Sequence, residues 1–355
     1  MTIRVGLIGT GYAAKKRAAA FIADRRSTVV AIASQSPKRA ESFAQSITQL
    51  AISEDPGLLE TDGDGKGIRG SDIHVETDAI TLINRPDIDL VVITTENHLH
   101  GHLIYTALMG GKHVVVEYPL SLDVSEAEEL IALAKQQYLL LHVEHIEVLS
   151  SIHLVLQENL KYIGSPSYGR YASFKADRPA PERWSYHVWK LGFPLVGALS
   201  RLNRLINIFG PVAAISCQAQ FWDRQGQVLP DYPELTTFAS MVCSAQMTFT
   251  NGMFAELVYG KGECIWTRDR ILDIHGSRGR IVLEPKGGTL ILEDSAQPLS
   301  VGSRRGLFAQ DTAYVLDFLD NGTPIYISPE ESLYALKVAD AARRSAETRE
   351  TITEF

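Results

Sequence analysis

The sequence has 355 residues, of which 45% are hydrophobic and 21% are charged, and its formal net charge is −8. This composition is ordinary for a soluble globular protein, and the length exceeds the size at which one hydrophobic core stops growing, so two domains are expected. The acidic balance argues against a general nucleic-acid-binding protein, because neutralising phosphates needs a basic face. It leaves room for a local basic pocket that binds an anionic small molecule.

Neither a membrane segment nor a secretory leader is expected. No apolar run approaches the ~18 to 20 residues needed to span a bilayer, and residues 2–14 indicate a strand and a phosphate-binding loop rather than a signal peptide. The cysteines Cys217, Cys243 and Cys264 stand singly, with no CxxC pair and no disulfide spacing. This pattern is typical of free thiols in a reducing compartment, so we expect a cytoplasmic protein.

The first part of the chain alternates between predicted strands and predicted helices. Strands are expected at 3–8 and 28–34, each followed by a helix, at 15–26 and 37–47. Such βαβα alternation predicts a parallel sheet covered by helices. Residues 51–76 are rich in Gly and Asp and have little apolar periodicity, so they predict a surface loop inserted into this domain.

The alternation resumes after this loop. Apolar strands are expected at 89–95 and 113–119, with a helix between them at 103–111 that ends in glycines. Residues 124–137 predict an amphipathic helix, and residues 139–148 predict the strand that closes the sheet and leads out of the first domain.

From about residue 160, long strand-like runs follow one another with few helices between them, which predicts an open, largely antiparallel sheet. Helices are expected at 308–320 and 329–346. The predicted fold class is α/β, with an N-terminal Rossmann-type parallel sheet and a C-terminal α+β domain on a large, mostly antiparallel sheet. The predicted division is 1–122 for the cofactor domain and 123–355 for the substrate domain. It leaves open whether the C-terminal helices pack back on the first domain.

A dinucleotide-binding motif follows the first predicted strand. Gly9, Gly11 and Ala14 have the G-x-G-x-x-A spacing between a strand and a helix. The glycines allow a tight turn and close approach of a pyrophosphate, whose charge the helix N-terminus favours. The loop residues expected to contact the cofactor are Gly9, Thr10, Gly11, Tyr12, Ala13 and Ala14.

The end of the second strand indicates which nicotinamide cofactor is bound. An NAD site usually has an acidic residue there, which holds the ribose 2′-hydroxyl. This chain has Ser34, Ser36, Lys38 and Arg39 instead, two hydroxyls and two cations that suit a 2′-phosphate. NADPH is therefore expected over NADH, with a solvated helix start as the alternative explanation for the two cations.

Beyond the cofactor loop, the chain resembles the glucose–fructose oxidoreductase/inositol dehydrogenase family. Residues 89–122 are similar to a family block that commonly contains T-P-N-x-x-H and, later, G-K-H-V-x-x-E-K-P. The resemblance covers nearly the whole chain except the 51–76 loop. Within the family, residues 111–122, 140–149 and 191–201 resemble the members that reduce the linear tetrapyrrole biliverdin, and residues 180–186, 259–263 and 301–312 resemble those of cyanobacterial type.

The chain departs from the sugar dehydrogenases of this family at their proton relay. Those enzymes oxidise an alcohol and need a base to take its proton. The resemblance places Tyr118 where they have the lysine of E-K-P, and it places Arg201 and Leu205 where they have the aspartate and histidine of D-x-x-x-H. Because Leu205 cannot transfer a proton, sugar oxidation by the family mechanism is not expected.

The resemblance implies instead that NADPH reduces biliverdin to bilirubin, with hydride added to the central methine carbon and a proton to a pyrrole nitrogen. Arg201 is the first candidate for electrostatic stabilisation, because its planar guanidinium offers five donors and stacks on π systems. A water or a bilin propionate under its direction is an equally compatible proton source. Tyr118, a phenol with a reference pKa near ~10, is expected to position and stack rather than to act as a general acid.

The resemblance also implies further contacts, whereas a metal site is not expected. In a strand, His142 and Glu144 share one face and His145 points the other way, so these residues do not form a ligand cluster. Arg183, Arg304 and Arg305 are candidates for propionate or phosphate contacts, with a solvated surface charge as the alternative for each. The predicted cofactor contacts outside the loop are Ser34, Ser36, Lys38, Arg39, Thr94, Thr95, Asn97, His100, Glu117 and Tyr118, and the predicted substrate contacts are Glu144, His145, Arg183, Phe193 and Arg201.

Two other functions remain open from the sequence. One is an oxidoreductase of a sugar-like or other small substrate that lacks the usual base relay. The other is a non-catalytic NADP-binding sensor. The oligomeric state is open as well, between a monomer and a homodimer.

Overall fold

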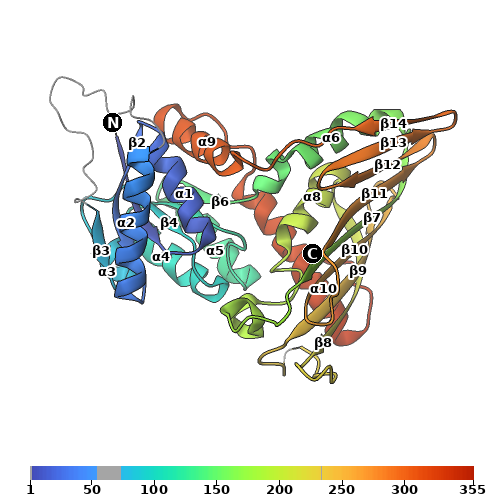
Figure 1. The fold of residues 1–355 in the computed structure, drawn as a ribbon, viewed down its shortest axis with the longest axis horizontal. Coiled ribbons are helices and arrows are strands. Elements are labelled where there is room, and N and C mark those ends of the chain that lie inside the picture. The colour runs from blue at the N-terminus through green and yellow to red at the C-terminus, as the bar shows by residue number, and fades with distance from the viewer. Residues whose placement is uncertain (1, 54–72, 233) are drawn as a thin grey trace. The chain divides into compact units, whose positions relative to one another are not determined.

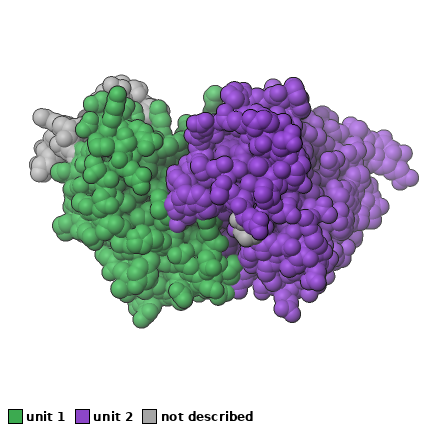
Figure 2. Space-filling view, turned by 90° about the horizontal axis from the view of Figure 1, so that it is seen from below, with its two compact units in different colours: residues 1–95, 99–144, 305–330 green, residues 96–98, 145–304, 331–355 purple. Residues whose placement is uncertain are grey.

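The computed structural model describes residues 2–53, 73–232 and 234–355. Contacts divide the chain into two compact units, which Figure 2 shows in different colours. None of the helices in the described ranges has the length and apolar character needed to cross a membrane. Unit 1 consists of residues 1–95, 99–144 and 305–330, and unit 2 of residues 96–98, 145–304 and 331–355.

Unit 1 contains a six-stranded sheet in which every neighbouring pair of strands is parallel (Figure 1), with the order β3-β2-β1-β4-β5-β6. Its central strands are continuous apolar runs because helices cover both faces of such a sheet. The strands are β1 (Ile3–Ile8), β2 (Ser27–Ala33), β3 (His74–Glu76), β4 (Leu90–Ile93), β5 (His113–Val116) and β6 (Leu141–Val143). The helices are α1 (Tyr12–Ala23), α2 (Pro37–Ser53), α3 (Ala79–Ile83), α4 (His100–Met109), α5 (Val124–Gln136) and α9 (Leu307–Asn321).

Unit 1 contains more of the chain than the predicted cofactor domain, which ends at residue 122. The contacts between residues add residues 123–144 and 305–330 to it. β6 pairs in parallel with β5, so α5 and β6 complete the first sheet. The helix α9 packs against α1 and adds Val315 and Leu316 to the same core. The other C-terminal helix, α10 (Pro329–Thr348), lies almost wholly in unit 2.

The predicted surface loop at 51–76 lies mostly outside the described residues. Its two ends are regular structure: α2 continues to Ser53, and β3 (His74–Glu76) pairs in parallel with β2 at the edge of the sheet. The loop prediction is therefore wrong at both ends. Residues 51–53 and 74–76 are too few to show a periodicity of their own, and the pairing of residues 74–76 with β2 is a contact that the local sequence does not reveal.

Unit 2 is built on an eight-stranded sheet with the order β14-β13-β12-β11-β7-β10-β9-β8. All neighbouring pairs are antiparallel except β7 and β10, so the predicted fold class is confirmed. The helices α6, α8 and α10 lie on one face of this sheet (Figure 1). The strands are β7 (Pro166–Ala176), β8 (Val212–Trp222), β9 (Ser240–Phe249), β10 (Phe254–Gly262), β11 (Asp269–Gly276), β12 (Gly279–Glu284), β13 (Gly287–Leu292) and β14 (Ser295–Leu299).

The helices of unit 2 connect these strands and contribute to its core. Short 3₁₀ helices occur before α6 and α7, and one of them follows β6 directly. The helices are α6 (Ser151–Asn159), α7 (Val188–Leu191), α8 (Leu199–Phe209) and α10. The 3₁₀ helices in the described residues are η1 (Asn97–Leu99), η2 (Ile146–Leu149), η3 (Leu160–Tyr162) and η4 (Trp184–Tyr186).

All three cysteines are free thiols. Two of these thiols are in contact, because the antiparallel pairing of β8 with β9 places Cys217 Sγ 3.5 Å from Cys243 Sγ. Both thiols are buried, whereas Cys264 is exposed. Sequence spacing could not show this pair, since the two residues belong to different strands.

Candidate functional site

The loop between β1 and α1 has the geometry that a dinucleotide requires. Gly9 has a φ of +111°, and a Cβ at this position would lie 2.5 Å from the carbonyl oxygen of Thr94, so a larger residue does not fit. A Cβ on Gly11 would meet nothing within 4 Å, so there is open space at the start of α1. Among the described residues, no side chain caps this helix, which leaves its N-terminal N–H groups for an anion.

The carboxyl end of β2 presents cations next to this loop. Ser36 directly precedes α2 and caps its first turn. Its Oγ accepts a hydrogen bond from Arg39 N at 3.4 Å, and its carbonyl accepts one from Ala40 N at 3.0 Å. Lys38 and Arg39 are exposed on the first turn of the helix, and neither has an ion pair within the described ranges. Their charges are therefore available to a phosphate group.

Two of the predicted cofactor contacts, His100 and Asn97, form hydrogen bonds to backbone carbonyl groups. Fully buried His100 places its Nδ1 2.7 Å from the carbonyl oxygen of Pro119, and both residues belong to unit 1. Asn97 belongs to unit 2, where its side-chain amide donates to the carbonyl of Leu191 at 2.8 Å. Both side chains serve as scaffolding in this structure, and their contacts with a cofactor stay predictions.

A buried charge cluster fixes Glu117 at the end of β5. Arg17 of α1 is fully buried, donates from Nε to Glu117 Oε1 at 3.1 Å, and forms an ion pair with Asp311 of α9. Asp311 also accepts a hydrogen bond from Tyr326 at 2.6 Å and lies 2.8 Å from His142 Nε2. Burial alone would raise the pKa of the Asp311 carboxyl, but the charges of Arg17 and His142 outweigh it and hold the pKa well below its usual range.

Glu144 follows β6 and lies within this cluster. Burial raises the pKa of the Glu144 carboxyl well above its usual range, and the charge of Glu117, to which it is hydrogen-bonded, raises it further against the opposing charge of Arg17. Burial in this cluster therefore favours the protonated, neutral form of Glu144. The expectation that His145 lies on the opposite face of a strand is wrong, because β6 ends at Val143.

We expect Glu144→Gln to stabilise the protein more at pH ~7 than at pH ~4. A carboxyl whose pKa is raised on folding binds its proton more tightly in the folded state, so stability falls as the pH rises from about 4.5, the ordinary value, towards the raised value. The neutral amide removes this loss. Urea unfolding midpoints of wild type and variant at several pH values measure the effect, and a difference that does not grow with pH contradicts it.

Arg201 lies in unit 2, near the start of α8. Its guanidinium carbon is 4.8 Å from the ring centroid of Tyr259 on β10, a stacking distance for a cation on an aromatic face. Its Nε is buried, and no partner accepts its hydrogen bond among the described residues. A buried donor without an acceptor is costly, so Arg201 has hydrogen-bonding capacity for a ligand. Leu205, one turn further along α8, is fully buried in the core.

A second basic side chain, that of Lys261, lies near Arg201. Lys261 of β10 is buried, donates to the carbonyl oxygen of Ser185, and lies 4.6 Å from the ring centroid of Tyr186. Burial lowers the pKa of Lys261 to about 7, and the charges of Lys175, Arg183 and Arg201 also lower it, against an opposing effect of Asp177.

Asp177 balances only part of this positive charge. It accepts a hydrogen bond from Lys175 at 2.8 Å and one from the Tyr186 hydroxyl at 2.7 Å, and Arg183 is 3.4 Å away. Burial would raise the pKa of the Asp177 carboxyl, but these three partners lower it below the usual range. One carboxylate thus faces several cations.

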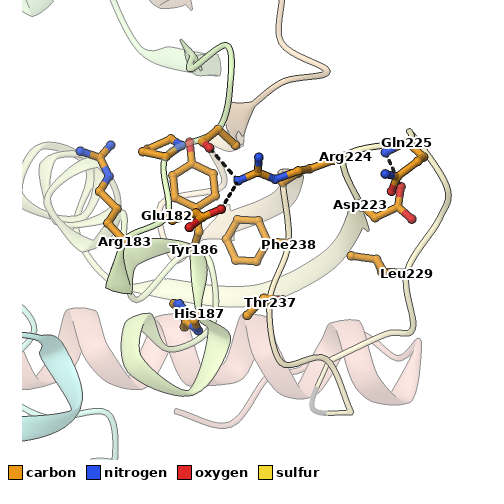
Figure 3. A pocket seen from close by; sticks show the side chains of 13 residues that line it. Glu182, Arg183, Tyr186, His187, Asp223, Arg224, Gln225, Leu229, Thr237 and Phe238 are labelled. Carbon is orange, nitrogen blue, oxygen red and sulfur yellow. Dashed lines mark hydrogen bonds and ion pairs between the residues drawn. The ribbon is translucent and has the colours of Figure 1, made fainter.

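A pocket of about 470 Å³ in unit 2 shares residues with this group (Figure 3). The rings of Tyr186 and Phe238 line it, together with the predicted substrate contact Arg183. At its wall, Arg224 donates to Glu182 at 3.2 Å and to the carbonyl of Ala180 at 3.3 Å, as the dashed lines in Figure 3 show.

Two other predicted substrate contacts are core residues of unit 2. Phe193 is buried and packs edge-on against Tyr232, with ring centroids 5.6 Å apart. His145 is fully buried, with Nε2 2.9 Å from Ser332 Oγ. Contacts of Phe193, His145 and Glu144 with a substrate stay predictions. Within the described ranges, no group of three or more His, Cys, Asp or Glu side chains is arranged to hold a metal ion.

Comparison with known proteins identifies the class. Residues 3–145 match the family described as "Oxidoreductase family, NAD-binding Rossmann fold", and residues 157–353 match "Oxidoreductase family, C-terminal alpha/beta domain". The protein is therefore a nicotinamide-dependent oxidoreductase. The chain belongs to this family, the glucose–fructose oxidoreductase/inositol dehydrogenase family that its sequence resembles.

The relatives confirm the resemblance to biliverdin-reducing members. Biliverdin reductase from Synechocystis sp. PCC 6803, solved in complex with biliverdin and NADP+, is 40% identical, with a TM-score of 0.85 over 97% of this chain and 99% of that chain. Biliverdin reductase A of Mus musculus is 36% identical over 37% of this chain, and the match spans only 41% of that relative's length. Levoglucosan dehydrogenase, solved with NADH and L-sorbose, is 18% identical with a TM-score of 0.78 over 99% of each chain, which shows the fold alone.

Proposed function

We propose that this protein reduces biliverdin to bilirubin with NADPH. The observation that carries the proposal is the 40% identity, over 97% of the chain, to a reductase solved with biliverdin and NADP+. In the reaction, a hydride adds to the central methine carbon and a proton adds to a pyrrole nitrogen, so NADPH is oxidised and the tetrapyrrole gains two electrons.

The charge distribution of unit 2 supports an anionic substrate. The whole chain has a formal net charge of −8, yet Lys175 and Arg183 both contact the carboxylate of Asp177, and the charge of Arg201 reaches the neighbouring Lys261 as well. A local excess of cations in an acidic protein attracts negatively charged ligands. Biliverdin bears two propionates, so it has the required charge.

Arg201 has the chemical properties needed for the transfer step. When bound, the nicotinamide supplies the hydride that reduces the tetrapyrrole. We propose that the Arg201 guanidinium lies against the conjugated system and stabilises the negative charge that develops there. A guanidinium gives up a proton only with difficulty, so the proton comes from a water or a propionate that Arg201 orients.

Tyr118 and the carboxylate before it have supporting roles in this proposal. Glu117 is fixed by Arg17 of α1, at the first turns after the dinucleotide loop. This ion pair connects the end of β5 with the helix that binds the pyrophosphate, and so positions the adjacent Tyr118. In this proposal the Tyr118 ring provides a flat wall for the nicotinamide and does not act as a general acid.

Replacing Lys38 and Arg39 together by alanine should raise the KM for NADPH by ~10- to 100-fold and leave the KM for NADH nearly unchanged. Two hydrogen bonds to a 2′-phosphate at this exposed position, each worth about 0.7 to 1.4 kcal/mol, account for the difference. Steady-state kinetics with both cofactors measure it. Lys135→Ala, which removes a cation paired with Glu330 at 2.6 Å elsewhere in unit 1, is the control. Equal effects on both cofactors would contradict a phosphate contact.

The test of the proposed function is spectroscopic. Purified protein with NADPH and biliverdin should remove the long-wavelength biliverdin band and produce the bilirubin band at neutral or mildly acidic pH. No conversion across this range would exclude the function. Turnover in a polyol screen would then favour an oxidoreductase of sugar-like substrates, and tight NADPH binding without any turnover would favour a sensor.

A further inference from the structure

Glu147 of η2 is a buried carboxylate that three arginines from separate elements approach. Arg204 of α8 donates from Nη2 to Glu147 Oε2 at 2.6 Å, and Arg270 of β11 donates from Nη2 to the same oxygen at 2.7 Å. Arg304, which follows β14, forms an ion pair with the other oxygen, Oε1. All four residues belong to unit 2.

The positive charge of this cluster exceeds what Glu147 balances. Burial alone would raise the pKa of the Glu147 carboxyl, but Arg270, Arg204 and Arg304 outweigh it and lower the pKa to about 2. The carboxylate is therefore ionised, and three positive charges against one negative charge leave a surplus of two. The hydroxyl of Tyr171 accepts a hydrogen bond from Arg204 at 3.0 Å and one from Arg270 at 2.7 Å, which holds the two guanidinium groups beside Glu147.

The arginines form a series from the interior to the surface. The side chain of Arg204 is 0% exposed, that of Arg270 18% and that of Arg304 54%, while that of Glu147 is 9% exposed. One buried arginine would suffice to neutralise Glu147. The other two keep donors without a partner in the described part of the chain, since Arg304 bonds only through Nη2 and Arg270 only through Nε and Nη2.

The Glu147 cluster lies on the same sheet face as Tyr259, the residue on whose ring Arg201 stacks. Arg270 pairs with Ser173, and Ser173 pairs with Tyr259, so the three side chains share one face across β11, β7 and β10. At the usual strand spacing, Arg270 and Tyr259 are roughly 10 Å apart. Arg201 and Arg204 stand three residues apart on α8 and so share one side of that helix.

We propose that Arg270 and Arg304, organised by Glu147, bind a carboxylate of the substrate. The proposal rests on the proposed function and deepens it, because it assigns one propionate of the tetrapyrrole to this cluster. Glu147 fixes one edge of each guanidinium, and the remaining donors offer a planar, charge-assisted contact to a second carboxylate. The surplus charge of the cluster is neutralised when that carboxylate binds.

Arg304→Gln tests this site, with biliverdin and its dimethyl ester as paired substrates. The variant should raise the KM for biliverdin about tenfold, change kcat by no more than about twofold, and leave the KM for the ester as it is in wild type. Arg280→Gln is the matched control, because Arg280 bonds to Asp273 at 2.8 and 2.7 Å and pairs in register with His275, on the opposite sheet face. It should change none of these constants.

Three outcomes would overturn the site. An equal increase of KM for biliverdin and for the ester would mean that Arg304 acts through the structure of the pocket. An increase confined to the KM for NADPH would assign the cluster to a cofactor phosphate. If wild type reduces no bilin, the proposed function fails, and the binding of biliverdin, measured by absorbance titration, then tests the carboxylate site. Weaker binding by Arg304→Gln than by wild type supports the site. Equal binding by the two proteins, or no binding by wild type, rejects it. Arg270→Lys, which keeps the charge but loses the planar fork, provides a second variant with the same expected pattern.

Discussion

Arg201→Ala is expected to lower kcat for biliverdin reduction by ~10²-fold or more, with a smaller effect on the KM for NADPH. The guanidinium is the group proposed to stabilise charge on the tetrapyrrole, and removing a positioned electrostatic donor costs on this scale. The structure shows Arg201 stacked on Tyr259 with its Nε buried and without an acceptor in the described ranges, so the capacity to bind a ligand is already in place. Single-turnover kinetics with excess enzyme measure the chemical step directly.

Two further variants distinguish chemistry from packing. Arg201→Lys keeps the charge and loses the plane, so an intermediate rate is expected. Arg178→Ala removes an exposed arginine whose guanidinium lies 3.5 Å from the Trp266 ring centroid, a similar stack elsewhere in unit 2, and it should turn over as wild type does. Unchanged turnover in Arg201→Ala would remove Arg201 from the mechanism.

Arg17→Met is expected to lower the free energy of unfolding by ~3–5 kcal/mol. Arg17 is fully buried between Glu117 and Asp311, and its removal leaves carboxylates in the core without their cation. Methionine fills much of the same volume, so the loss reports the missing charge rather than a cavity. Urea unfolding followed by circular dichroism measures the change.

The matched control for this prediction is Arg4→Met in the same unit. Arg4 pairs with Asp89 at 2.7 Å, but their side chains are 40% and 29% exposed, so the expected loss is ~1 kcal/mol or less. If Arg17→Met costs no more than Arg4→Met, the buried cluster does not stabilise unit 1 in the way its geometry indicates.

Local patterns predicted most elements of unit 1, with β3 and α3 as exceptions, because most of these elements are marked within their own segment. The strands at 3–8, 28–34, 89–95 and 113–119 are apolar runs, and each is present within a few residues of the expected ends. The glycine loop was recognisable because its spacing follows a strand and opens a helix. The family resemblance then indicated Tyr118, Arg201 and Leu205 as departures from the alcohol-oxidising relay.

The residues that the sequence did not reveal act through long-range contacts. Arg17 and Asp311 are separated by 294 positions, and nothing in α1 or α9 alone indicates that they pair. The charge cluster around Glu147 was not predicted either, because its arginines lie on α8, on β11 and after β14. Helix α8 itself was not predicted, since a short amphipathic segment between strand-like runs gives a weak signal.

The most direct test of the central claim follows the hydride itself. NADPH that carries deuterium at both C4 positions of the nicotinamide is incubated with the protein and biliverdin, and the product is analysed by mass spectrometry and NMR. The proposed function predicts bilirubin with a single deuterium, located on the central methylene carbon. Bilirubin that forms without deuterium at this carbon, or no bilirubin at all, would contradict it.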